Sequence, residues 1–131
     1  MERHLIPSPD GGFALAARTS QTATIANGES VSAPIDLANT ALLGLIMPAA
    51  WTAAALTVEV SVDDSTWTGL AYDDLGTQCN VIASPVASSA YALNMVGLLP
   101  YRYVRLRSGT TATPVNQGAE RIVTVVTRPL A

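Results

Sequence analysis

Residues 56–72 read LTVEVSVDDSTWTGLAY, and this stretch decides the fold class. Leu56, Val58, Val60 and Val62 alternate with Thr57, Glu59, Ser61 and Asp63 until Asp63-Asp64-Ser65 interrupts the pattern. Successive side chains of an extended chain point to opposite faces, so the aliphatic groups share one face and the polar groups share the other. We therefore predict a half-buried strand of an antiparallel sheet that runs into a tight turn, with Trp67 and Tyr72 on the return leg.

Short apolar runs separated by turn residues continue through the rest of the chain. We predict further strands at residues 22–26, 29–37, 42–47, 78–83, 91–93, 101–107 and 121–128. Asn27-Gly28 and residues 73–76 read as turns, and residues 48–55 as a loop that has room for one helical turn. The sequence thus predicts an all-β fold, an antiparallel β-sandwich of about eight strands, with no long helix.

Face assignments follow from the same alternation. In residues 29–37 the buried face is predicted to hold Val31, Ala33, Ile35 and Leu37, with Pro34 marking an edge or a bulge. In residues 101–107 the apolar face is predicted to be Val104 and Leu106. In the final strand Ile122, Thr124 and Val126 oppose Val123, Val125 and Thr127.

The first 19 residues differ from the rest of the chain. They contain Pro7, Pro9, Gly11 and Gly12 and show little periodicity, which predicts an extended arm. We divide the chain into an N-terminal arm at residues 1–19 and a β-sandwich domain at residues 20–131. The arm is expected to dock on a neighbouring subunit, and docking on its own sandwich is the alternative.

Composition favours a protein that is packed against neighbours. At 131 residues the chain has room for a single core, and 49% of it is apolar while 13% is charged, against ~25% charged in an ordinary soluble domain. Large neutral surfaces tend to associate in water. The alternative is simply a small, Ala-rich sandwich.

Charge and hydropathy also exclude classes of partner. The formal net charge of −3 and the lack of a basic run argue against nucleic acid as a partner. No apolar stretch approaches ~18 residues, so no membrane span is expected. No basic region followed by an apolar run opens the chain, so we expect no signal peptide. Arg102, Arg105 and Arg107 cluster on one predicted strand, where we expect a solvated or interface-pairing role.

The chain lacks a recognisable catalytic or metal-binding set, and we predict neither enzyme activity nor a cofactor. Cys79 is the single cysteine, expected to be a free buried thiol, and His4 is the single histidine. No Gly-rich phosphate loop and no paired Cys/His set are present. The pairs Asp63-Asp64 and Asp73-Asp74 sit at predicted turns, where Asp bonds to backbone N–H groups; binding of calcium by them is the minor alternative.

Aromatic residues raise one competing function. A sugar-stacking platform of the kind found in glycan-binding sandwiches would draw on Trp51, Trp67, Tyr72, Tyr91, Tyr101 and Tyr103. Aromatic rings more often fill cores and subunit contacts, and a sandwich fold does not select one function. Glycan binding therefore remains an alternative class, with Trp51 and Tyr101 as its test positions.

About half of the chain resembles small structural proteins of tailed bacteriophages and related particles. Those proteins show a pattern G-L-x-x-P-x-x-W-T-x-A-x-L-T-F-x-x-S-x-D-G-x-T-W, which residues 44–67 match, followed here by Leu70, Tyr72, Asp73 and Gly76. Residues 98–107, LLPYRYVRLR, resemble their strand of alternating Arg and hydrophobic residues. This chain has Val58 where Phe is common and Asp64 where Gly is common.

The resemblance implies a virion component with a jelly-roll or related sandwich that acts by assembly. We expect a head-associated role, as a capsid decoration protein or the base of a head spike or fibre, with a tail, baseplate or fibre-attachment component as the alternative. The expected partners are copies of itself and the major capsid protein or other virion proteins, and the expected location is the virion, assembled in the host cytoplasm. Candidate interface residues are Arg3, His4, Phe13, Arg102, Arg105 and Arg107.

Overall fold

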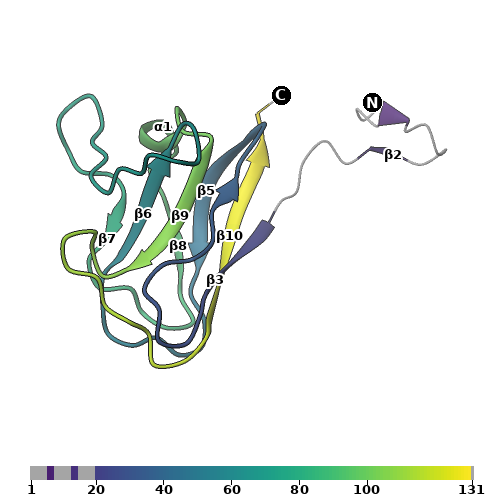
Figure 1. Cartoon of the computed structure of the whole chain (residues 1–131). Coiled ribbons are helices and arrows are strands. Elements are labelled where there is room, and N and C mark those ends of the chain that lie inside the picture. The colour runs from purple at the N-terminus through teal and green to yellow at the C-terminus, as the bar shows by residue number, and fades with distance from the viewer. Residues whose placement is uncertain (1–5, 8–12, 15–19, 131) are drawn as a thin grey trace.

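The computed structural model describes residues 6–7, 13–14 and 20–130, and residues 20–130 form two antiparallel four-stranded sheets that face each other (Figure 1). The first sheet has the order β3 (Ser20–Ile25), β10 (Arg121–Pro129), β5 (Thr40–Ile46), β8 (Ala90–Ala92). The second has the order β4 (Ile35–Asp36), β9 (Tyr103–Ser108), β6 (Leu56–Ser61), β7 (Val81–Ile82). The predicted antiparallel β-sandwich is confirmed.

The strand order is that of a jelly roll. Going along the chain from β3 to β10, every connection crosses from one sheet to the other except the one between β6 and β7, which are neighbours in the second sheet. This double-sheet, eight-stranded arrangement leaves short edge strands, and β4 and β7 at the edges of the second sheet have two residues each. The jelly-roll character of the predicted sandwich is therefore confirmed.

The core lies between the sheets and follows the predicted alternation. From the second sheet it takes Val58, Val60, Val104 and Leu106, all at most 2% exposed. From the first sheet it takes Ala23, Ile25, Leu45, Val123 and Val125, likewise at most 2% exposed. Each fully buried Val, Leu or Ile contributes roughly 1.5–3 kcal/mol relative to an exposed one, so these alternating aliphatic residues hold the layers together.

Strand β6 departs from the prediction because it is buried on both faces. Thr57, Glu59 and Ser61 were predicted to face solvent, yet they are 0%, 0% and 4% exposed. Side chains of Arg105, Arg107 and Thr111 bond to Glu59 on that face, and the Thr57 hydroxyl donates to the Gly109 carbonyl. The half-buried interpretation of β6 is therefore wrong, and its polar side chains are interior groups that need partners.

Two predicted strands are shorter than their sequence pattern. In residues 29–37 the strand is limited to Ile35–Asp36 with a single bridge at Val31, and Ala33, predicted to be buried, is exposed. In residues 78–83 it is limited to Val81–Ile82. Pro34 lacks an N–H for the ladder, which accounts for the short pairing around it.

The turn after β6 is built by aspartate, as predicted. Asp63 Oδ1 accepts hydrogen bonds from the backbone N–H groups of Ser65 and Thr66, and these bonds lower the pKa of the Asp63 carboxyl. Asp64 has φ of +60°, a left-handed conformation that Asp adopts more readily than most non-glycine residues. Val62 lies in this turn and is 69% exposed, so it is not on the core face.

One short helix appears where none was predicted. Helix α1 spans Met95–Leu98, and the Asn94 side chain caps it by accepting from the Gly97 N–H at 2.9 Å. The described loop 48–55 holds no helical turn and is instead fixed by the Trp51 indole, which donates to the Ala54 carbonyl at 3.1 Å.

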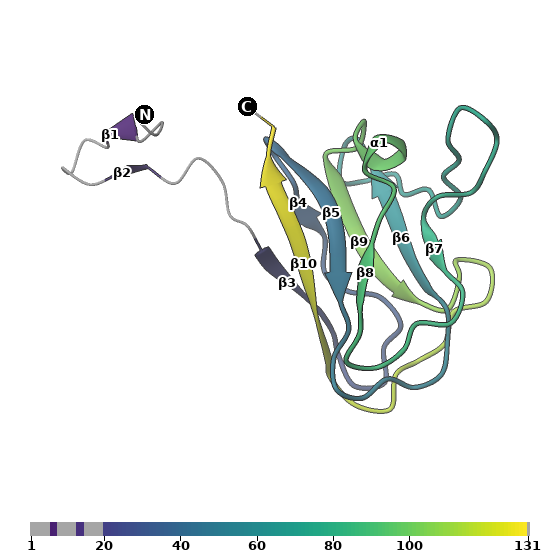
Figure 2. The same ribbon diagram turned by 180° about the vertical axis from the view of Figure 1, so that it is seen from behind.

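Most of the predicted arm lies outside the described residues. The part that is described consists of β1 (Ile6–Pro7) and β2 (Phe13–Ala14), which pair antiparallel with each other. They pair with neither large sheet and stand apart from both in Figure 2.

Candidate functional site: a neutral groove over a buried ion-pair network

Glu59 is the centre of an ion-pair network on the outer face of the second sheet. The register of β6 and β9 places Glu59 opposite Arg105 and Thr57 opposite Arg107. Arg105 Nε lies 2.7 Å from Glu59 Oε1, and Arg107 Nε lies 2.6 Å from Oε2. The Thr111 hydroxyl also donates to Oε2. The carboxylate is thus held by donors from a neighbouring strand and from the loop that follows it.

The network keeps Glu59 ionised although its side chain is 1% exposed. Burial alone would raise the pKa of this carboxyl, but hydrogen bonds from Arg107, Thr111 and Arg105 outweigh that effect and hold the pKa below its ordinary value. A buried ion pair is costly to desolvate and seldom adds more stability than an apolar replacement. Its clearest consequence here is geometric, because it fixes the side chains around it.

The network extends to an aromatic ring through Arg105. The Arg105 guanidinium carbon lies 4.4 Å from the centre of the Trp67 ring, within the range of a cation–π contact. Trp67 is half-buried, and it precedes Thr68, whose backbone pairs with Val60 of β6. The buried carboxylate therefore positions the indole by way of one arginine.

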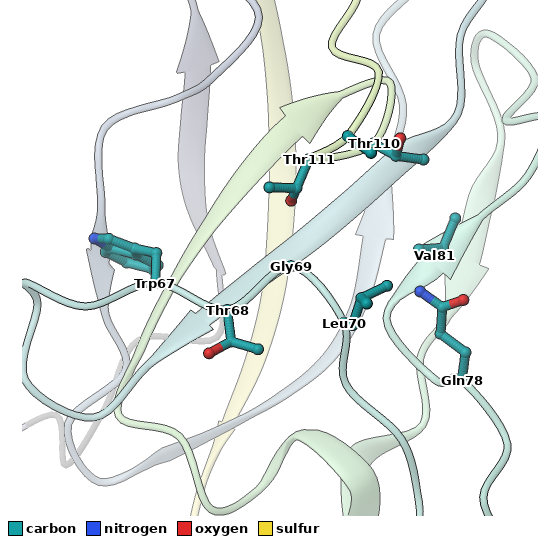
Figure 3. Close-up of a pocket in the computed structure, with 9 residues that line it drawn as sticks. Trp67, Thr68, Gly69, Leu70, Gln78, Val81, Thr110 and Thr111 are labelled. Atoms are coloured by element: carbon teal, nitrogen blue, oxygen red, sulfur yellow. The ribbon is translucent and has the colours of Figure 1, made fainter.

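A groove of about 570 Å³ lies above this network. Its walls come from three separate parts of the chain and include Trp67, Leu70, Gln78, Val81, Thr110 and Thr111. Figure 3 shows Trp67 at one end, Leu70, Gln78 and Val81 at the other, and Gly69 and Thr111 between them. No lining residue is charged. The groove therefore combines apolar surface with hydroxyl and carboxamide groups and offers no counter-ion.

Gly69 fits tightly against the loop that completes the network. A Cβ built on Gly69 would lie 1.8 Å from Thr111 Oγ1 and 2.6 Å from Thr111 Cβ. The absence of a side chain thus lets the segment at residues 67–70 reach residues 110–112 and close the groove around the network.

A second uncharged surface covers the outer face of the first sheet. On β10, Val123, Val125 and Thr127 face the core, so Ile122, Thr124 and Val126 point outward. The register aligns these with outward residues of the adjoining strands. We call this set the neutral face: Ser20, Thr22, Thr24, Gly44, Ile46, Ala90, Ala92, Ile122, Thr124 and Val126.

The neutral face carries exposed apolar side chains and no charge among its ten residues. Ile46 is 44% exposed and Ile122 is 49% exposed, and Ala90 and Ala92 are also exposed. Arg128, near the end of β10, borders it. Since the two sheets face each other, the neutral face and the groove lie on opposite sides of the sandwich.

The candidate interface arginines have different surroundings. Arg102 pairs with Asp36 at 2.9 Å on the surface, where the two side chains are 57% and 45% exposed. That pairing lowers the pKa of the Asp36 carboxyl and raises the pKa of Arg102. Arg105 and Arg107 instead belong to the Glu59 network. Arg102 is thus the most exposed of the three, and the interface role stays a prediction.

The arm candidates cannot be placed in the same way. Arg3 and His4 lie outside the described residues, and Phe13 is described as part of β2 by its backbone alone.

The predicted aromatic platform is not gathered in one place. Trp51, Tyr91 and Tyr101 are partly buried against the core, and the Tyr91 hydroxyl accepts from the Val86 N–H. Tyr72 is 53% exposed, next to the turn where Asp73 Oδ1 accepts from two backbone N–H groups. Trp67 alone of the six lines the groove.

Sequence reasoning missed Glu59, Thr111 and Gln78 as site residues. A signal for Glu59 was present, since it is the one charged residue in LTVEVS and fits the Arg-x-Arg alternation of residues 105–107 if the two strands pair. Cys79 is half-buried rather than fully buried, and burial raises the pKa of its thiol. In the described part of the chain, no group of three or more His, Cys, Asp or Glu residues is placed to hold a metal ion.

Within the same described residues, no helix has the length and apolar character needed to cross a membrane.

Comparison with known proteins gives little. No family model matches the chain, and no curated protein matches its sequence. Among solved structures, the chain is similar to the crystal structure of SPBc2 prophage-derived protein YomS, with a TM-score of 0.46 and 9% sequence identity. The match covers 88% of this chain and 100% of that one. A likeness at this level says nothing of activity or partners.

Proposed function

We propose that this protein is a structural component of a bacteriophage virion and that it works by assembly with copies of itself and with the major capsid protein. The observation that carries the proposal is the neutral face, a four-strand surface with exposed Ile46 and Ile122 and no charge. Such a surface buries no charge when it packs against another protein, and its exposed isoleucines gain from leaving water. The resemblance of residues 44–67 to phage structural proteins supports the same role.

Within a virion we favour a head-associated position, as a capsid decoration protein or the base of a head spike or fibre. A tail, baseplate or fibre-attachment position is the alternative. Assembly would take place in the host cytoplasm, and the protein would reside in the finished particle. No reaction is part of this role.

The size of the neutral face fits repeated weak contacts. At strand spacings of ~4.8 Å and a rise of ~3.3 Å per residue, four short strands give a face of only a few hundred Å². A stable interface of standard size needs about 800 Å² on each partner, so this face alone supports a modest affinity. Many copies on one particle make modest contacts sufficient through multivalency.

The arm adds contact area in this proposal. Residues 1–19, with Arg3, His4 and Phe13, would extend over a neighbouring subunit, and Arg102 would supply a polar contact. Extended segments contact much surface per residue, although ordering them costs entropy.

Particles purified from the strain that encodes the chain provide the test. The wild-type protein should co-purify with particles in many copies, measured by quantitative mass spectrometry. Ile122→Lys should greatly reduce incorporation, because it places an unpaired charge on the neutral face. Leu75→Lys is the matched control, since Leu75 is 86% exposed in the 73–76 turn, away from that face, and it should incorporate normally. Equal incorporation of both variants would contradict the role given to the neutral face.

A further inference from the structure

The groove on the second sheet has the size and lining of a ligand site. Its volume of about 570 Å³ falls inside the ~300–1,000 Å³ typical of small-molecule sites. Such sites are mainly apolar with a few placed polar groups, and here Trp67, Leu70 and Val81 supply the apolar surface. The structure therefore offers a concave site apart from the neutral face.

The lining selects an uncharged ligand. The nine residues that line the groove include no Asp, Glu, Lys or Arg. An ionic group bound there would lose water without gaining a counter-ion, which is strongly unfavourable. The charges that contact lining residues are Glu59, which accepts from Thr111, and Arg105, which lies against the Trp67 ring, and these two charges pair with each other.

Polar groups in the groove retain hydrogen-bonding capacity. Gln78 donates through Nε2 to Asn80 Oδ1 at 3.2 Å, which leaves its carbonyl oxygen and its second N–H. The Thr110 hydroxyl oxygen accepts from the Thr113 N–H and retains its own proton. These groups match a ligand that both donates and accepts hydrogen bonds.

The site is held in shape before any ligand arrives. The Glu59 carboxylate fixes Arg105 against the Trp67 ring and accepts from Thr111, so one buried group positions the Trp67 end of the groove and its middle. A site with fixed walls loses less conformational freedom when it binds. This explains a buried ion-pair network at a place where an apolar pair would stabilise the fold equally well.

We propose that the groove binds a neutral oligosaccharide. A sugar ring has apolar C–H faces and a rim of hydroxyl groups that donate and accept, which matches an indole and aliphatic walls combined with Thr and Gln side chains. The site is that of Trp67, not of Trp51 or Tyr101, whose rings pack against the core. This inference does not rest on the virion role, because the groove and the neutral face are on opposite sides of the sandwich.

Tryptophan fluorescence tests the proposal directly. The chain has two Trp residues, so in a Trp51→Phe background Trp67 is the single reporter and it lies in the groove. Maltohexaose, cellohexaose and chitohexaose are titrated separately up to about 10 mM, which detects a Kd near ~1 mM. At least one should give a saturable change in fluorescence, confirmed by isothermal titration calorimetry.

Two groove variants test the residues. Thr110→Val and Gln78→Ala should each weaken binding about three- to tenfold, as expected for one lost hydrogen bond. Thr24→Val, the same change on the neutral face, should bind as the parent does. Far-UV circular dichroism and thermal melting establish that each variant is folded.

Three results would overturn the proposal. These are no saturable signal with any of the three sugars, binding unaffected by both groove variants, and an acidic sugar such as oligogalacturonate binding as tightly as the neutral ones. Tight binding of the acidic sugar would mean that the ligand's charge pairs with Arg107. None of these results bears on incorporation into particles, so the two proposals fail separately.

Discussion

Replacing Glu59 by Gln should destabilise the fold far more than its apparent place on a polar strand face suggests. The substitution keeps the size of the side chain but removes the charge that pairs with Arg105 and Arg107, whose side chains are 24% and 15% exposed. Breaking a buried pair by removing one partner costs about 3–5 kcal/mol. The partial exposure of the arginines places the expected loss near the lower end, about 3 kcal/mol, out of the ~5–15 kcal/mol that stabilise a typical domain.

Asp36→Asn is the matched control. Asp36 also pairs with an arginine, at 2.9 Å, but both partners are about half exposed. Exposed pairs contribute little and are screened by salt. This variant should therefore unfold at the same urea concentration as the wild type, within error.

Urea unfolding followed by far-UV circular dichroism at pH 7 is the assay, because this signal does not depend on Trp67. The slope m should be unchanged and the midpoint should fall for Glu59→Gln alone. If Glu59→Gln costs less than about 1 kcal/mol, or no more than Asp36→Asn, the carboxylate is not the buried centre of a network and the reasoning from β6 fails.

Three further predictions follow from the same structure. The pKa of Glu59 is held below its ordinary value of 4.5, so its contribution to stability is present above that pH and declines as the pH falls through 4.5 toward the folded-state pKa. The difference in unfolding free energy between wild type and Glu59→Gln, measured by urea unfolding from pH 7 to pH 3, should therefore narrow over that window. Gly69→Ala should lose about 1–3 kcal/mol by overpacking, since its Cβ would lie 1.8 Å from Thr111 Oγ1, and Thr111→Gly in the same chain should recover part of the loss in thermal melts. Deleting residues 1–19 should abolish incorporation into particles while the remaining domain stays folded by circular dichroism; full incorporation of the truncated chain would remove the role proposed for the arm.

Local alternation was enough to predict the sandwich. Val58 and Val60 on one strand and Val104 and Leu106 on another are spaced by two, and that spacing alone assigns them to one face. The turn at Asp63 was predictable for the same reason, because an aspartate bonds to backbone groups two and three residues away. Strand faces and turns, which depend on residues close together in the chain, could therefore be predicted from the sequence.

The burial of Glu59 could not be predicted from the sequence, because it depends on segments that are distant in the chain. Thr111, which donates to Glu59, lies 52 residues further along, and the polar face of β6 is covered only once its loop and the segment around Gly69 close over it. The groove has the same origin, since Trp67, Gln78 and Thr110 come from three separate loops or turns. Alternation identifies which side chains share a face and says nothing of what later covers that face.

Cryo-electron microscopy of particles from the strain that encodes the chain would show whether this protein is part of the virion. We expect repeated copies of this jelly roll on the particle, with Ile46 and Ile122 of the neutral face buried against another subunit. Particles that lack the chain, together with a purified protein that sediments as a monomer at every concentration, would contradict this expectation.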